Sequence, residues 1–145
     1  MELKEIKKQI ESIVDKDVPL ISNLSNIASL LFKMDNINWA GFYLVENDKL
    51  ILGPFQGDPA CLIIPKGKGV CGTAFERKES IIVDSVNEFP GHIACSSLSK
   101  SEIVVPIIKD NDVKLVIDID APIYKRFNKD DLKILEEIAS LISEL

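Results

Sequence analysis

The two ends of the chain carry apolar residues at the spacing of amphipathic helices. Between Leu3 and Val14 the apolar positions recur every three or four residues, and Pro19 can open a second helix with a similar stripe. At the other end, Asn128 is a suitable cap for a helix whose apolar positions run to Leu145. The pattern therefore predicts two N-terminal helices and one C-terminal helix, each with one buried face.

The middle of the chain changes to the alternation and the residue types of β-strands. The clearest hairpin joins residues 39–46 to residues 49–56 through the turn dipeptide Asn47-Asp48. A second hairpin joins residues 102–109 to residues 113–119 through another turn rich in Asp and Asn. Both pairs predict antiparallel strands that are neighbours in one sheet.

Shorter elements lie between the two hairpins. Strands are expected at residues 61–64 and 81–84, with a short helix at 70–78 between them, whereas residues 87–99 show no period and predict a long loop. With the terminal helices, these elements predict an α+β fold in one domain over 1–145. We expect a central, mainly antiparallel sheet with the N- and C-terminal helices on one face and loops on the other.

Composition and charge narrow the function classes. The 145 residues include 17 basic and 23 acidic side chains, a formal net charge of −6, with no cluster of Lys and Arg. Because affinity for phosphate backbones comes largely from cationic contacts, we expect no nucleic-acid partner. No apolar run approaches the roughly 18 residues of a bilayer span, and the N-terminus lacks a signal-peptide core. We therefore expect no membrane partner and a cytoplasmic location.

Three cysteines, Cys61, Cys71 and Cys95, are candidates for thiol chemistry. An odd number in a chain without an export signal indicates a reducing compartment and not a disulfide framework. Cys71 lies among glycines near the start of the short predicted helix, where a buried thiol that packs as a small hydrophobe is the simplest interpretation. Cys95 lies in the irregular loop, whose sequence is not a core pattern, and is the better candidate for a reactive thiol.

Cofactor and metal chemistry fit the sequence less well. A Gly-x-Gly-x-x-Gly pattern at residues 67–72 lacks the βαβ unit of a dinucleotide site, so its glycines are expected to turn the chain and allow close backbone approach. The spacing of the cysteines and of His92 matches no common structural zinc site. His92 is also a weak candidate for a Cys–His dyad, because such partners usually come from distant parts of the sequence. We expect no bound cofactor and no metal.

Carboxylates and aromatic residues form the second candidate constellation. Alternation along a strand puts Asp118 and Asp120 on one face, where two like charges cost energy unless a cation or a shared proton lies between them. Glu102, at the start of the partner strand, could join the pair. Trp39 and Tyr43 share a face of the first strand and could form either an apolar wall around a ligand or ordinary core. Solvated acids at a strand end are the simpler alternative for the two aspartates.

Six segments together resemble the free methionine-(R)-sulfoxide reductases, a GAF-domain family: Asn38–Leu44, Leu52–Gly57, Gly69–Ala74, Gly91–Cys95, Ser101–Pro106 and Asp118–Asp120. They stand in the order found in that family and span nearly the whole chain, and all three family cysteines are present in the sequence. The resemblance implies a GAF-like fold. It also implies reduction of free, not protein-bound, methionine sulfoxide, with thioredoxin as the external reductant.

The resemblance also implies roles for the cysteines. Cys95 resembles the family nucleophile, Cys61 the cysteine that forms a disulfide with it, and Cys71 an auxiliary thiol. From the residues alone, the choice between Cys61 and Cys71 as the partner of Cys95 stays open. Leu115 stands where the family usually has Gly, and Ser96 stands where an acid often follows the nucleophile.

The resemblance implies that Glu102, Asp118 and Asp120 hold the substrate and assist at the sulfoxide oxygen, and that Trp39 and Tyr43 line the pocket. An acid near the sulfur suits this chemistry because the departing oxygen must be protonated. The alternative function is a non-catalytic GAF-type domain that binds a small ligand or senses oxidation through its thiols. The apolar terminal helices could, in addition, pair two copies as a homodimer.

Overall fold

The computed structural model describes residues 1–91 and 98–145. Along this part of the chain the elements follow in the order α1 (Leu3–Ile13), α2 (Leu20–Leu31), β1 (Trp39–Glu46), β2 (Lys49–Gly57), β3 (Ile63–Pro65), α3 (Gly69–Arg77), β4 (Ile81–Val83), a 3-10 turn (Val86–Glu88), β5 (Ser101–Lys109), β6 (Asp112–Ala121) and α4 (Lys129–Ser143).

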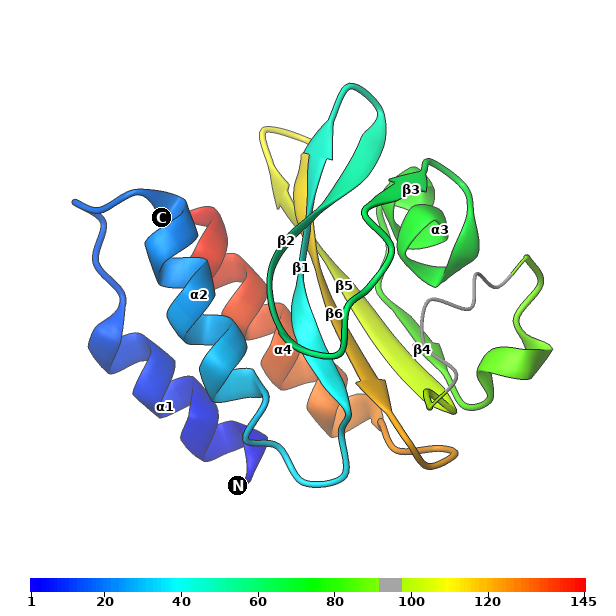
Figure 1. Cartoon of the computed structure of the whole chain (residues 1–145). Helices are drawn as coiled ribbons and strands as arrows, with labels where there is room; N and C mark the ends of the chain where they lie inside the picture. Colours follow the sequence, from blue (N-terminus) through cyan, green and yellow to red (C-terminus); the bar gives the residue numbers. More distant parts are fainter. Residues whose placement is uncertain (92–97) are drawn as a thin grey trace.

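One sheet forms the centre of the molecule (Figure 1). Its strand order is β3-β2-β1-β6-β5-β4, and each pair of neighbouring strands is antiparallel. The two hairpins β1–β2 and β5–β6 lie next to each other because β1 pairs with β6. Their two-residue turns, Asn47-Asp48 and Asp110-Asn111, have positive φ angles at both positions, as type I′ hairpin turns require.

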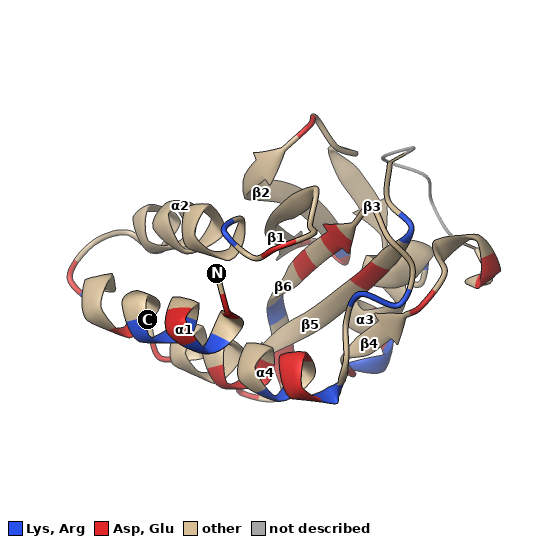
Figure 2. Ribbon diagram, turned by 90° about the horizontal axis from the view of Figure 1, so that it is seen from below, with Lys and Arg blue, Asp and Glu red and all other residues tan. Residues whose placement is uncertain are grey.

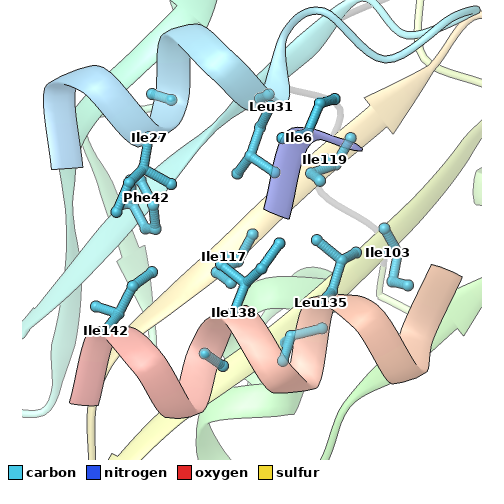
Figure 3. Packing of buried hydrophobic residues seen from close by; sticks show 14 of the residues in the cluster. Ile6, Ile27, Leu31, Phe42, Ile103, Ile117, Ile119, Leu135, Ile138 and Ile142 are labelled. Atoms are coloured by element: carbon cyan, nitrogen blue, oxygen red, sulfur yellow. The ribbon is translucent and has the colours of Figure 1, made fainter. Parts of the chain in front are cut away.

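The helices α1, α2 and α4 cover one face of the sheet (Figure 1). Figure 3 shows how their apolar stripes meet the strands: Leu135, Ile138 and Ile142 of α4 point toward Phe42 and Ile117. The start of α4 is fixed by a reciprocal cap between Asn128 and Asp131. This layer is the larger of the two apolar cores.

The opposite face of the sheet carries α3, beside the edge strand β3 (Figure 1). A second apolar cluster lies there, in which Trp39, Tyr43 and Val104 of the sheet pack with Val70 and Phe75 of α3. Because successive strand residues alternate between faces, this cluster takes the other half of each strand. The sheet is therefore covered on both faces, and the buried carboxyl side chains of Glu102 and Asp118 lie on the α3 side.

The predicted α+β architecture is confirmed, including the helices on one face and the two hairpins. The structure corrects the start of the third strand: β3 begins at Ile63, so Cys61 lies in the preceding connection and not in the strand. Cys95 and His92 fall outside the described residues. In the part of the chain that is described, no helix combines the length and the apolar character needed to cross a bilayer.

Gly41 allows a close approach of β1 and β2. A Cβ at this position would contact the Phe55 side chain and lie 2.8 Å from both Phe55 Cα and the Pro54 carbonyl oxygen. Because two of these are backbone atoms, Gly41→Ala is expected to destabilise the protein by about 1–3 kcal/mol. Gly53→Ala is the matched control, since the atom nearest its added Cβ is the tip of the Leu44 side chain, which can move. Urea denaturation of both variants measures the difference, and equal losses would contradict it.

Candidate active site

Register across three strands gathers the acidic side chains at one end of the sheet. Glu102 on β5 is directly opposite Asp120 on β6, and Trp39 on β1 is opposite Asp120 from the other side. Asp118, two residues earlier on β6, shares the face of Asp120. Glu102 and Asp118 are both buried. Figure 2 shows the resulting acidic bands next to each other on β5 and β6.

Helix α3 closes the space above these acids. Its Cys71 is buried, and the Cys71 Sγ lies 4.0 Å from Glu102 Oε2. Helix α3 and the sheet border a small cavity of about 40 Å³, which is room for a few water molecules. Its described lining residues come from β1, β3, β5, β6, α3 and the connections beside them: Trp39, Tyr43, Pro59, Ala60, Ile64, Lys68, Gly69, Val70, Cys71, Ser99, Glu102, Asp118 and Asp120.

The glycines at residues 67–72 let α3 sit this close to the sheet. A Cβ on Gly72 would lie 2.5 Å from the Pro65 carbonyl oxygen, so only glycine fits there without a shift. Gly67 adopts a positive φ of 82°, which turns the chain from β3 into α3. The Gly69 amide donates to the carbonyl oxygen of Gly91 at 3.2 Å. The expected role of these glycines in turning and close packing is confirmed.

An aromatic stack forms one wall of the cavity. The Trp39 ring stacks on Tyr43 at 6.0 Å and on Phe55 at 5.2 Å between ring centroids. The indole nitrogen of Trp39 donates to the Asp58 carbonyl oxygen at 3.0 Å, and the Tyr43 hydroxyl donates to the Cys61 carbonyl oxygen at 2.9 Å. Both rings are thus held rigidly, and Tyr43 ties the connection that carries Cys61 to the wall of the cavity.

The surroundings of the cluster favour the protonated forms of its acidic groups over the charged forms. Burial raises the pKa of Glu102 well above its ordinary value, and Asp118 and Asp120 raise it further by repulsion. Burial and the charge of Asp118 likewise raise the pKa of Asp120, although hydrogen bonds from Glu102 and Ser99 oppose that shift. Burial and the nearby carboxylates also raise the pKa of the Cys71 thiol. All three shifts favour the protonated forms of these groups, and a cation in the cavity would favour the charged forms.

The residues that the sequence reasoning did not single out as part of the site include Lys68 and Ser99, which line the cavity. They also include Phe55, which stacks on Trp39 and extends the aromatic wall. Phe55 had a signal in the sequence, because a glycine inside a strand pattern often marks close approach by a neighbour and Gly41 is paired with Phe55. Lys68 and Ser99 lie outside the strands, where alternation gives no direction for a side chain.

The cysteines are in different states. Cys71 is a free and buried thiol, whereas Cys61 is half-buried and disulfide-bonded. Cys95 lies outside the described residues, so its place relative to the cavity is not given by the structure. The five other predicted site residues, Trp39, Tyr43, Glu102, Asp118 and Asp120, all line the same cavity as Cys71.

A metal is the alternative to protons in such a cluster. The ligand atoms of Cys71, Glu102 and Asp118 lie within 4.8 Å of one another. Structural zinc sites close a tetrahedron with four protein ligands, usually with more than one Cys or His. Three groups of which two are carboxylates do not complete such a set within the described residues, so we assign them no metal.

Comparisons with known proteins place this geometry in a family. A GAF domain model matches residues 24–145. The free methionine-R-sulfoxide reductase of Saccharomyces cerevisiae is 48% identical over 151 residues, covering 98% of this chain and 84% of that protein. The Escherichia coli protein of the same name is 39% identical over 142 residues, covering 97% and 86%. The reduced form of fRMsr of Staphylococcus aureus superimposes with a TM-score of 0.94 and 51% identity, covering 99% of this chain and 94% of that one.

Proposed function

Because the chain belongs to the GAF-domain family of free methionine-R-sulfoxide reductases, we propose that it reduces free methionine-(R)-sulfoxide to methionine. The observation that carries this proposal is the small cavity in which a buried acid cluster faces an aromatic wall. The acids suit the ammonium group of a free amino acid, and the wall suits its apolar side chain.

The chemistry follows from thiol attack on the sulfoxide. The Cys95 thiolate attacks the sulfoxide sulfur, the oxygen is protonated and passes to Cys95, and methionine leaves with Cys95 as a sulfenic acid. A second thiol condenses with the sulfenic acid, which forms a disulfide and releases water. Thioredoxin then reduces this disulfide by exchange and is itself oxidised to a disulfide. One oxygen and two electrons are thus accounted for in each cycle.

Cys61 is the second thiol in this proposal. It is disulfide-bonded, whereas Cys71 is a free thiol buried against Glu102. The raised pKa of Cys71 keeps it in the thiol form, which is the poor nucleophile of the two forms. Cys71 therefore serves as part of the cavity lining and not as the resolving thiol.

The acid cluster selects a free amino acid over a peptide. An entering ammonium group offsets the repulsion among Glu102, Asp118 and Asp120, whereas a peptide would bring a neutral amide and leave the carboxylates without a counter-charge. A carboxylic acid that keeps its proton is also available to protonate the sulfoxide oxygen. Both properties follow from the raised pKa values of Glu102 and Asp120.

The proposal is tested by NADPH consumption in the presence of thioredoxin and thioredoxin reductase. We expect turnover with free methionine-(R)-sulfoxide and none with the S epimer. N-acetylmethionine-(R)-sulfoxide, which keeps the side chain but has no ammonium group, should react at least about 100-fold more slowly in kcat/KM. No turnover of the free R epimer would reject the reductase and leave a ligand-binding or redox-sensing GAF domain.

Asp118→Asn is expected to weaken binding of the free amino acid. The change removes one buried negative charge that faces the ammonium group, so KM should rise about tenfold or more. Asp112→Asn is the control, because it removes the same charge from the exposed opposite end of β6. Steady-state kinetics of both variants with the free R epimer measure the effect. Unchanged kinetics for Asp118→Asn would contradict the ammonium site.

A further inference from the structure

The ladder between β1 and β2 contains a β-bulge next to the cavity. Gly41 of β1 pairs with Phe55 of β2. Two residues further along β1, Tyr43 pairs with Leu52, which lies three residues before Phe55. Two residues of β2 therefore lie opposite one residue of β1, which defines a bulge. Bulges bend a strand, change the direction of the side chains that follow, and are frequent beside active sites.

The bulge places the Phe55 side chain on the cavity face of β2. Side chains alternate along a regular strand, so residues separated by an odd number of positions point to opposite faces. Leu52 and Phe55 are three positions apart, yet both pack against the apolar cluster on the α3 side. Regular alternation would have turned Phe55 toward the layer of α1, α2 and α4. The extra residue of the bulge therefore directs the Phe55 ring to the face that carries Trp39.

Gly41 leaves the room that Phe55 needs beside Trp39. Gly41 and Trp39 are two positions apart on β1 and share a face. A Cβ on Gly41 would contact the Phe55 side chain, so a glycine at this position lets Phe55 come close to β1. The rings of Phe55 and Trp39 stack with their centroids 5.2 Å apart and their planes inclined by 13°. The bulge and the glycine together thus form a diagonal aromatic pair across the ladder.

We propose that Phe55 is a positioning residue that fixes the plane of the Trp39 ring and thereby sets the size of the apolar group that the cavity accepts. Trp39 lines the cavity, whereas Phe55 is not among its described lining residues, so Phe55 acts through Trp39. The indole also donates to the Asp58 carbonyl oxygen at 3.0 Å and stacks on Tyr43 at 6.0 Å. One hydrogen bond restrains an atom at the ring edge but leaves the ring free to tilt. The closer stack on Phe55 restrains that tilt.

This inference rests on the proposed function and refines its substrate range. An apolar pocket discriminates against one additional methylene by about 10–200-fold, and only as long as its wall does not yield. In a cavity of about 40 Å³, a small tilt of the Trp39 ring changes the space for an alkyl group on the sulfoxide sulfur. With Phe55 in place, the ring stays fixed and a methyl group is preferred. Without the Phe55 ring, Trp39 can tilt and a larger alkyl group can enter.

The first test needs no substrate. Trp39 is the one tryptophan of the chain, so the fluorescence anisotropy decay of the ligand-free protein reports the motion of its ring. In Phe55→Leu the amplitude of the fast phase should grow about twofold or more, because the indole loses its closest ring neighbour. Phe55→Tyr keeps the ring and should decay like the wild type. Phe55→Met is a second variant without a ring, to be used if the leucine variant does not fold.

Phe75→Leu is the matched structural control. Phe75 belongs to the same apolar cluster, but its described ring contact is with the Lys66 ammonium group, 4.9 Å from the ring centroid. Loss of this ring should lower the free energy of unfolding in urea without changing the anisotropy decay. The inference is overturned if the leucine and methionine variants of Phe55 decay like the wild type, if Phe75→Leu enlarges the fast phase equally, or if Phe55→Tyr does not restore the wild-type decay.

A second test measures selectivity with dithiothreitol as reductant. Free ethionine-(R)-sulfoxide carries one more methylene on the sulfur than free methionine-(R)-sulfoxide. The ratio of kcat/KM for the ethionine to the methionine substrate should rise about tenfold in Phe55→Leu and stay at the wild-type value in Phe55→Tyr and Phe75→Leu. An unchanged ratio in Phe55→Leu would refute the role in selectivity. If the wild type turns over neither substrate, the proposed reductase fails, and the anisotropy decay alone decides whether Phe55 fixes Trp39.

Discussion

Cys95→Ser is expected to abolish reduction of free methionine-(R)-sulfoxide, whereas Cys71→Ser keeps most of the activity. A serine hydroxyl is a far weaker nucleophile than a thiolate at neutral pH, so the loss for Cys95→Ser should be at least about 10³-fold in kcat. At position 71 a serine still places a hydrogen-bond donor toward Glu102, where the Cys71 Sγ now lies 4.0 Å from the carboxylate. The thioredoxin-coupled assay measures both variants.

Cys61→Ser separates the two thiol steps. If Cys61 resolves the sulfenic acid, this variant should release about one methionine per protein in a single turnover and then stop with thioredoxin. The sulfenic acid should accumulate and react with a sulfenic-acid trapping reagent, as mass spectrometry can show. Equal losses in Cys71→Ser and Cys95→Ser would contradict the assignment of roles. Sustained thioredoxin-dependent turnover of Cys61→Ser would exclude it as the resolving thiol.

The acidic side of the cavity could be predicted from local pattern. Asp118 and Asp120 share a face because strand side chains alternate, and the β5–β6 hairpin follows from the turn that joins the strands. Once that hairpin forms, Glu102 must meet Asp120. Side-chain alternation and cross-strand pairing involve only a strand and its neighbour in a hairpin. A single sequence therefore carries enough information to predict them.

The position of α3 over the sheet could not be predicted from local pattern. The distance between Cys71 and Glu102 depends on how close the helix comes to the sheet, which Gly72 permits by passing against the Pro65 carbonyl oxygen. Read from its glycine-rich neighbourhood, Cys71 is a packing residue, and its burial agrees with that interpretation. Its acidic surroundings arise from contacts between elements distant in sequence, which no periodicity encodes.

The place of Ser99, in the connection before β5, also could not be predicted from the sequence pattern. It belongs to the region without periodicity, where the direction of a side chain is set by the hydrogen bonds that it makes. Its partner Asn38 lies 61 positions away along the chain. Long-range polar contacts of this kind become visible only when the elements are assembled.

Glu102→Gln is expected to stabilise the substrate-free protein at neutral and alkaline pH while it impairs catalysis. Burial and the repulsion of Asp118 and Asp120 raise the folded-state pKa of Glu102 above its ordinary value of 4.5. A raised carboxyl pKa contributes stability that is fully present below the unfolded-state pKa and is lost as the pH rises through the folded-state pKa. A glutamine amide donates to the neighbouring carboxylates at every pH and never acquires the charge.

The difference in unfolding free energy between Glu102→Gln and the wild type should therefore grow with pH. Below about pH 4.5 the two proteins differ little from this cause, and by pH 8 the variant should be more stable by about 1–3 kcal/mol. Urea denaturation between pH 4 and pH 8 measures this trend. Glu46→Gln, which removes the same charge from an exposed position near the end of β1, should show no such growth.

The same substitution should lower kcat by about 100-fold, because an amide cannot give a proton to the departing oxygen. The substitution then raises stability and lowers activity at one buried residue. This is expected of a site in which repulsion among carboxylates destabilises the substrate-free protein and is relieved when a cation binds. Free methionine should accordingly stabilise the wild type more than Glu102→Gln at pH 8, since its ammonium group relieves a repulsion that the variant has already lost. A variant less stable than the wild type at pH 8, with unchanged kcat, would mean that Glu102 is an ordinary hydrogen-bonding residue of the core.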